Sequence, residues 1–178
     1  LFSSDRLVDF SVTTGERNTA VGRSALLLST GSQNTGVGFN VLADNTTGQY
    51  LTAIGSRALK ANTTADNNTA VGTDALLSNT TGTNNTALGI NALKANTTTN
   101  NNTALGRDTL QATTGNNNTA IGSLALYENT TVDNNTAVGA QALEKNTTGS
   151  PNTAVGFQSL LSNTTGTQNA AVSYTHLT

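Results

Sequence analysis

Few side chains in this sequence could carry out acid–base chemistry, and those few are scattered. Asp66 and Asp133 stand at equivalent places in a recurring pattern, as do Asp74 and Asp108. A hydrolytic pair of carboxyl groups works at separations of roughly 5 to 10 Å. Cysteine is absent, and the one histidine is His176, near the end of the chain. These carboxylates therefore have neither a thiolate nor an imidazole to act with.

A short repeat decides how far apart the carboxylates lie. The stretch Asn-Thr-Ala-Val-Gly at 68–72 recurs along the chain. Its glycine returns every 16 or 17 residues, at Gly22, Gly38, Gly55, Gly72, Gly89, Gly106, Gly122, Gly139 and Gly156. Such a period is typical of a solenoid in which each repeat forms one coil.

Stacked coils would keep the carboxylates apart. At a strand spacing of about 4.8 Å, Asp66 and Asp133 are separated by roughly 19 Å, and Asp74 and Asp108 by roughly 10 Å. We interpret them as solvated surface charge. The chain also lacks the Gly- and Asp-rich nonapeptide with which other solenoids bind calcium. We therefore predict no catalytic residue, no cofactor, no metal site and no enzyme.

Two apolar rows accompany the glycines. The residue before each Gly is aliphatic, and the fourth residue after it is Leu. We predict that these rows form the structural core: Val21, Leu26, Val37, Leu42, Ile54, Leu59, Val71, Leu76, Leu88, Leu93, Leu105, Leu110, Ile121, Leu126, Val138, Leu143, Val155 and Leu160. Other positions vary between copies, which indicates a solvent-facing surface. Candidates there for contact with a partner are Phe39, Arg57, Arg107, Tyr127 and Phe157.

The pattern excludes a helix and favours short strands. The two apolar rows lie five residues apart, and Gly and β-branched residues interrupt each repeat. The alternation in Asn-Thr-Ala-Val-Gly predicts a strand with Thr and Val on one face and Ala on the other. A second short strand should follow around Ala-Leu, and then a turn rich in Gly and Asn. We predict an all-β fold, a parallel β-solenoid of about nine coils of 16 or 17 residues.

The repeat also sets the expected domain organisation. Residues 1–17 form a degenerate N-terminal coil or cap, and residues 18–172 form the solenoid. Residues 169–172 start a tenth copy whose glycine is due at position 173, but residues 173–178 are instead a string that resembles a translated sequencing adapter. We interpret that tail as non-native.

Two apolar residues per coil make a thin core. Burying a Val or Leu is worth about 1.5–3 kcal/mol, whereas ordering each residue costs about 1–2 kcal/mol. Stacked Asn and Thr ladders, or a core shared between chains, could compensate. The small Ala side chains leave a face on which neighbouring chains can approach, so we predict a homotrimer.

Composition excludes two classes of partner. The chain is 35% hydrophobic and 10% charged, with a formal net charge of −2. No basic stripe is present to neutralise phosphates, which argues against nucleic acid. No apolar run approaches the roughly 20 residues that span a bilayer, so we expect no membrane insertion by this segment.

The recurring Asn-Thr-Thr turns admit two further interpretations. Pairs such as Thr63-Thr64, Thr80-Thr81 and Thr97-Thr98 could form a flat array of hydroxyls and methyls, similar to ice-binding solenoids. They could equally form ladders within the stack. The sequons at Asn62 and Asn79 could be glycosylated in a secreted protein, or could be the turn chemistry of the repeat.

The repeat at 68–72, followed by Ala75-Leu76, resembles the head repeats of trimeric autotransporter adhesins of the YadA-like type. It resembles equally the shaft repeats of phage tail fibres. Both resemblances imply a left-handed parallel β-roll, trimeric, outside the cell or on a virion, with a host-surface protein or glycan as partner. Residues 71–76 also fit the hexapeptide repeat of left-handed β-helix acyltransferases, which however have coils of about 18 residues and use a histidine.

We therefore expect a non-enzymatic structural or adhesive segment of a surface adhesin or phage tail fibre. It would be a stiff rod whose variable residues make multivalent attachments. The alternative is a monomeric, Thr-rich ice-binding solenoid.

Overall fold

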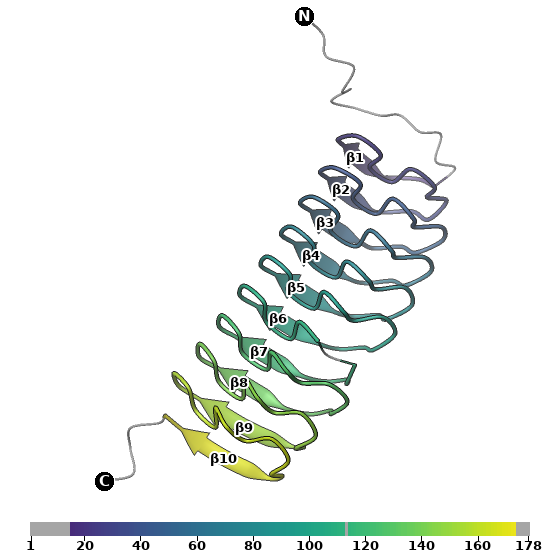
Figure 1. Ribbon diagram of the computed structural model, residues 1–178. Helices are drawn as coiled ribbons and strands as arrows, with labels where there is room; N and C mark the ends of the chain where they lie inside the picture. Colours follow the sequence, from purple (N-terminus) through teal and green to yellow (C-terminus); the bar gives the residue numbers. More distant parts are fainter. Residues whose placement is uncertain (1–14, 113, 174–178) are drawn as a thin grey trace, which may run out of the picture.

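The structure is a computed structural model that describes residues 15–112 and 114–173. It is a stack of coils, each contributing one short strand to a single ten-stranded sheet (Figure 1). The strands are β1 (Thr19–Val21), β2 (Thr35–Val37), β3 (Thr52–Ile54), β4 (Thr69–Val71), β5 (Thr86–Leu88), β6 (Thr103–Leu105), β7 (Thr119–Ile121), β8 (Thr136–Val138), β9 (Asn152–Val155) and β10 (Asn169–Val172). The predicted all-β parallel solenoid is confirmed. The predictions for the N-terminal cap and the tail fall mostly on residues 1–14 and 174–178, outside the described residues.

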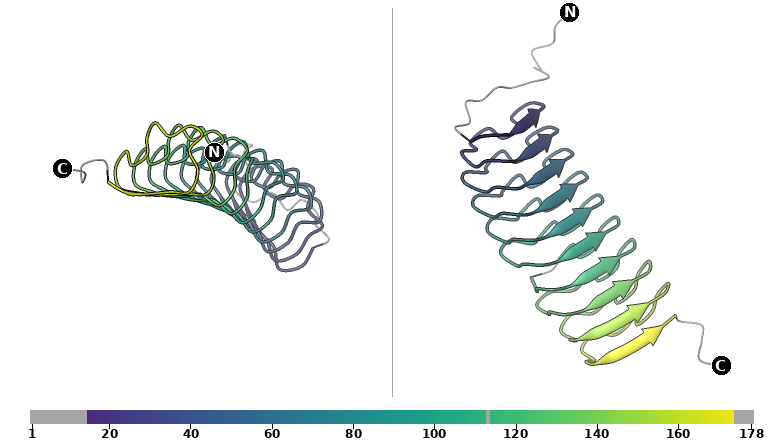
Figure 2. Two further views of the ribbon diagram at one scale, coloured as in Figure 1. Left: turned by 90° about the horizontal axis from the view of Figure 1, so that it is seen from below. Right: turned by 180° about the vertical axis from the view of Figure 1, so that it is seen from behind.

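Neighbouring strands are parallel and aligned without offset. Between β3 and β4, Thr52 lies opposite Thr69 and Ile54 opposite Val71. The same alignment holds in every pair from β1 to β9, so each repeat position forms a row along the stack. A view from behind shows the strands side by side in chain order (Figure 2).

The core lies between this sheet and a second layer formed by the Ala-Leu segments. The predicted leucine row is buried as expected: Leu26, Leu42, Leu59, Leu76, Leu93, Leu110, Leu126 and Leu143 have no exposed surface. Leu160, in the last complete coil, is partly buried. Across from the leucines lie the strand alanines, such as Ala70 and Ala87, also fully buried.

The prediction that the aliphatic row forms core is wrong. These side chains point away from the second layer, and several are substantially exposed, from 36% at Val21 to 44% at Leu88. A strand of three residues places its first and third side chains on one face and its second on the other. The row comprises Val21, Val37, Ile54, Val71, Leu88, Leu105, Ile121, Val138 and Val155.

Space explains why alanine and not valine faces inward. Gly36 occupies the alanine position in β2, and a Cβ atom there would lie 3.2 Å from Val41 Cγ1 and 3.5 Å from Leu26 Cγ. Val41 stands where most coils have alanine, so in this coil glycine in the strand makes room for valine in the second layer. The space between the layers is therefore limited. Because the alanines fill the chain's own core, they are not available to neighbouring chains, and the predicted alanine interface is wrong.

The predicted second strand does not form. After each Gly the chain enters turns in which alternate residues have left-handed backbone angles, as at Asp74 (φ 60°) and Leu76 (φ 51°). An extended strand cannot contain such residues. The layer is held by bonds between coils instead, such as Leu76 N–H to Ala92 O at 3.0 Å.

The recurring glycine has a steric cause. Gly72 has φ of +133°, a value that disfavours every residue with a Cβ atom. A Cβ atom at this site would also lie 2.6 Å from the carbonyl oxygen of Gly89 in the next coil. The turn at the end of each strand can therefore close tightly on the next coil only when it contains glycine.

Buried asparagines complete the interior. In one ladder each side-chain amide donates to the amide oxygen of the preceding coil, as from Asn62 to Asn45 (2.8 Å) and from Asn79 to Asn62 (3.1 Å). In a second ladder the backbone N–H of each asparagine bonds the Oδ1 atom of the asparagine one coil earlier, as from Asn85 to Asn68 at 2.8 Å. Buried polar groups are tolerated when they are paired in this way. The two ladders add hydrogen bonds between neighbouring coils to the contacts of the narrow apolar core.

Candidate functional site

The exposed side of the sheet is a regular surface, because the strands are aligned without offset. We call it the outer sheet face, and it consists of the aliphatic row and a parallel threonine row. The threonine row contains Thr19, Thr35, Thr52, Thr69, Thr86, Thr103, Thr119, Thr136 and Thr153. No other described segment crosses in front of these strands (Figure 2). From β1 to β9 this face contains no charged side chain.

The exposure of the outer sheet face is unusual for aliphatic residues. Ile54 is 41% exposed, Leu88 44% and Leu105 40%, and they occupy one row of the aligned sheet. Isolated exposed apolar residues are common on proteins, whereas a contiguous row indicates a surface that contacts something else. The outer sheet face is therefore the first candidate site.

The turn threonines behave differently. The Thr63 hydroxyl donates to the carbonyl of Thr80 at 3.1 Å, and the Thr80 hydroxyl donates to the carbonyl of Thr97 at 3.1 Å. Hydroxyls bonded along the stack cannot donate the same proton to a ligand. These contacts support the ladder interpretation for the first threonine of each pair, whereas the second, as at Thr64 and Thr81, is exposed.

The sequon asparagines are also interior. Asn62 and Asn79 have no exposed surface, and each amide nitrogen also donates to a carbonyl of its own turn, Ala65 at 3.1 Å and Gly82 at 3.0 Å. A transferase cannot reach them in the folded chain. The interpretation of Asn-Thr-Thr as turn chemistry agrees with these contacts.

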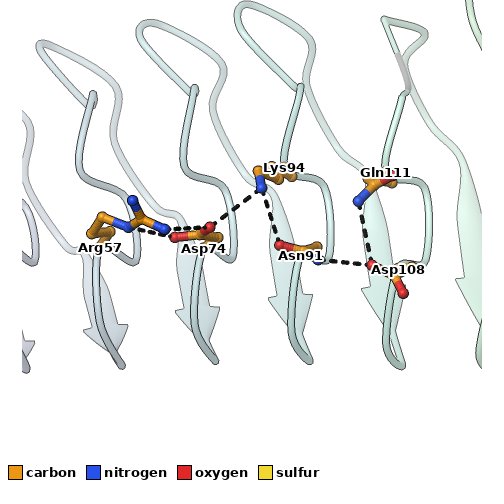
Figure 3. Close-up of polar contacts among 6 residues, drawn as sticks. All are labelled: Arg57, Asp74, Asn91, Lys94, Asp108 and Gln111. Atoms are coloured by element: carbon orange, nitrogen blue, oxygen red, sulfur yellow. Dashed lines mark hydrogen bonds and ion pairs between the residues drawn. The ribbon is translucent and has the colours of Figure 1, made fainter.

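A second candidate site is a line of polar contacts on the segments that follow β3 to β6 (Figure 3). We call it the charged ladder; its members are Arg57, Asp74, Asn91, Lys94, Asp108 and Gln111. The Arg57 guanidinium donates from Nε and Nη2 to the two oxygens of Asp74, both at 2.8 Å. Lys94 Nζ lies 3.3 Å from the same carboxylate.

The charged ladder continues toward β6. Lys94 donates to Asn91 Oδ1 at 3.3 Å, and Asn91 donates to Asp108 Oδ1 at 2.8 Å. Gln111 donates to the same Asp108 oxygen at 3.3 Å. Every member therefore bonds another, and contacts such as Arg57 to Asp74 and Asn91 to Asp108 link residues 17 positions apart.

The interpretation of Asp74 as solvated surface charge is wrong. Its side chain is only 6% exposed and is shared by two cations. A buried carboxylate requires such partners because losing water is costly. Arg57 occupies the repeat position of Asp74 one coil earlier, and Lys94 lies in the next coil. The alignment of the coils brings both cations to the carboxylate.

The other carboxylates also serve the stack. Asp66 Oδ1 accepts the backbone N–H of Gln49 at 2.7 Å, and Asp133 Oδ1 accepts that of Asn116. Each of these carboxylates therefore binds the backbone of the preceding coil. Among the described residues, no group of three or more His, Cys, Asp or Glu side chains could hold a metal ion.

The structure brings only some of the predicted contact residues together. Phe39 is 40% exposed, and its ring lies 4.7 Å from the Arg23 guanidinium carbon. Phe157 is 62% exposed, and Tyr127 is half-buried. Arg107 lies 3.4 Å from Asp108, at the edge of the charged ladder, which also contains Arg57. The structure thus brings the two arginines to the charged ladder and places Phe39 beside Arg57, whose backbone N–H donates to the Phe39 carbonyl at 2.8 Å. Tyr127 and Phe157 lie in later coils, after β7 and β9.

Comparison with known proteins adds no family to this description. No family model, curated protein or solved structure matches the chain. Within residues 15–112 and 114–173, no helix has the length and apolar character needed to cross a membrane.

Proposed function

We propose that the chain is a non-enzymatic structural and adhesive segment of an extracellular surface adhesin or phage tail fibre. In this role the solenoid is a stiff spacer, and the side chains on its surface make weak contacts that many copies reinforce. The observation that carries the proposal is the outer sheet face, an uncharged, aligned surface with one aliphatic residue per coil, exposed in most coils and half-buried in the others.

The proposal includes association of three copies through the outer sheet face. The residues of this face repeat about every 4.8 Å over nine coils, so a partner must present groups at the same spacing. A second copy of the chain has the same strand spacing. Removing aliphatic surface from water favours association, although the ordering of chains and side chains at the interface offsets part of that gain. We therefore assign the trimer interface to the aliphatic and threonine rows, in place of the buried alanines.

Sedimentation velocity on the purified chain tests this proposal. An elongated particle with three times the 18.1 kDa chain mass is expected. A particle with the mass of one chain at micromolar concentration would contradict the trimer. A compact, near-spherical particle would contradict the rod.

A second candidate function is the binding of ice by a monomer. The threonine row of the outer sheet face favours it, because this row presents one threonine per coil on an open sheet. Thermal hysteresis and faceted ice crystals in dilute solutions of the chain are the expected signs. Ice growth indistinguishable from that in buffer would rule this function out.

A further inference from the structure

We propose that a hollow beside the charged ladder binds a carboxylate-bearing sugar; this inference rests on the attachment role proposed above and names its ligand. The hollow has a volume of about 390 Å³ and is lined by Arg57, Lys60, Ala61, Leu77 and Ser78. Small-ligand sites have volumes of roughly 300 to 1,000 Å³. The hollow lies between the coils of β3 and β4, on the segments that form the second layer.

Arg57 is held in place before any ligand arrives. Its Nε and Nη2 atoms bond the nearly buried Asp74 carboxylate, and 47% of its side chain remains exposed. The Nη1 group makes no hydrogen bond to a described residue and is left for a ligand. Guanidinium groups recognise carboxylates through paired N–H donors, and a fixed side chain loses little entropy on binding.

The charge around the hollow is positive although the chain as a whole has a formal net charge of −2. Arg57 and Lys94 share the single carboxylate of Asp74, which leaves one positive charge unbalanced. Lys60 pairs with Asp44 at 3.2 Å, and both side chains of that pair are more than one-third exposed. Exposed ion pairs contribute little stability, so Lys60 can turn to a ligand carboxylate at small cost.

The remaining lining suits a sugar ring better than a peptide. Ala61 and Leu77 provide a half-buried apolar wall, and the Ser78 hydroxyl makes no hydrogen bond to another described residue. The backbone N–H groups of Ala61 and Ser78 are already bonded to Leu77 O and Lys94 O, each at 3.1 Å. An extended peptide would need such backbone groups to add as a strand. A ligand in the hollow must therefore be recognised by side chains. The cationic and hydroxyl groups there favour a ligand with a small ring, one carboxylate and several hydroxyls.

Saturation-transfer NMR on the full chain tests the site, with glucuronic acid as probe and glucose at equal concentration as control. We expect transfer to glucuronate only. Lys60→Gln should weaken binding about tenfold, the usual effect of losing a charged hydrogen bond. Arg57→Gln should do the same, and Lys145→Gln, an exposed lysine away from the hollow, should change nothing.

Three outcomes would overturn the proposal: equal transfer to glucose and glucuronate, no transfer to either sugar, or binding unchanged in Lys60→Gln. Displacement of glucuronate by an equal concentration of the peptide Gly-Glu-Gly would overturn the sugar assignment. It would show that the site binds a carboxylate without recognising the sugar ring. Light scattering and circular dichroism on the same samples separate this inference from the proposed function. Loss of sugar binding by an intact trimer contradicts only the sugar site.

Discussion

The backbone N–H of Asn102 donates to the Oδ1 atom of Asn85 at 3.0 Å, although the two residues lie 17 positions apart. Both are fully buried. Asn85 also donates its amide hydrogen to the Thr99 carbonyl at 2.8 Å, so one side chain joins its own coil to the next. This relationship recurs along the stack and holds neighbouring coils in register.

Asn85→Leu should therefore destabilise the chain. The substitution leaves the N–H of Asn102 and the carbonyl of Thr99 without these partners in a buried site. A buried polar group without its partner costs about 1–3 kcal/mol, partly offset here by the apolar leucine. We expect a net loss of about 2 kcal/mol in the free energy of unfolding, measured by urea denaturation followed by circular dichroism.

Asn135→Leu is a matched control for Asn85→Leu. In the parent chain, the Oδ1 atom of Asn135 accepts the backbone N–H of Asn152 at 2.9 Å. The side-chain amide nitrogen of Asn135 is buried without a hydrogen-bond partner. The substitution removes one bond and one unpaired donor together, so its cost should be clearly smaller. Equal losses at both sites would show that side-chain shape, and not the second hydrogen bond, sets the cost.

Asp74→Asn tests the charged ladder. The variant keeps the shape of the side chain but loses the charge that holds Arg57 and Lys94. We expect a loss of about 1–2 kcal/mol by thermal or urea unfolding, less than a fully buried pair would give, because Arg57 is half-exposed. Asp44→Asn removes one partner of the exposed pair with Lys60 and should cost less than about 0.5 kcal/mol. A larger effect at Asp44 than at Asp74 would contradict this assignment.

Gly72→Ala tests the steric cause of the repeat. The new methyl group would meet the Gly89 carbonyl oxygen at 2.6 Å, and alanine is strained at φ of +133°. Strain of this kind costs about 1–3 kcal/mol, and the clash adds to it, so we expect a fall in the thermal midpoint of several degrees. Thr73→Ala, at the adjacent exposed position, should leave the midpoint nearly unchanged. A midpoint for Gly72→Ala within one degree or so of the parent would show that the turn can relax.

Periodicity was sufficient to predict the coil, the strand position and the buried leucines. It also indicated that Thr69 and Val71 share one face and Ala70 the other. It did not indicate which face is inside, because hydrophobicity favours burying valine, whereas the small side chain of each strand, alanine in most coils, fills the narrow gap between the layers. A strand of three residues offers no further alternation to decide between the two.

The charged ladder and the asparagine ladders depend on contacts between coils. Asp74 looked like surface charge because its partners Arg57 and Lys94 lie in other coils, 17 and 20 positions away in the sequence. The sequence pattern indicated turn chemistry at Asn62, and the recurrence of asparagine at that position also suggested stacked ladders; the structure shows both kinds of bond at Asn62. The particular partners follow from the alignment of the coils, which the sequence alone does not give.

Multi-angle light scattering on the parent chain and two variants tests the central claim, association through the outer sheet face, most directly. The first variant combines Ile54→Glu and Leu88→Glu on that face. The second variant carries Ile90→Glu; Ile90 is 52% exposed but lies outside the aliphatic row. We predict three chain masses for the parent and for Ile90→Glu, and one chain mass for the double variant, all with the same circular dichroism. A parent with one chain mass, or a double variant that keeps three, would contradict the claim.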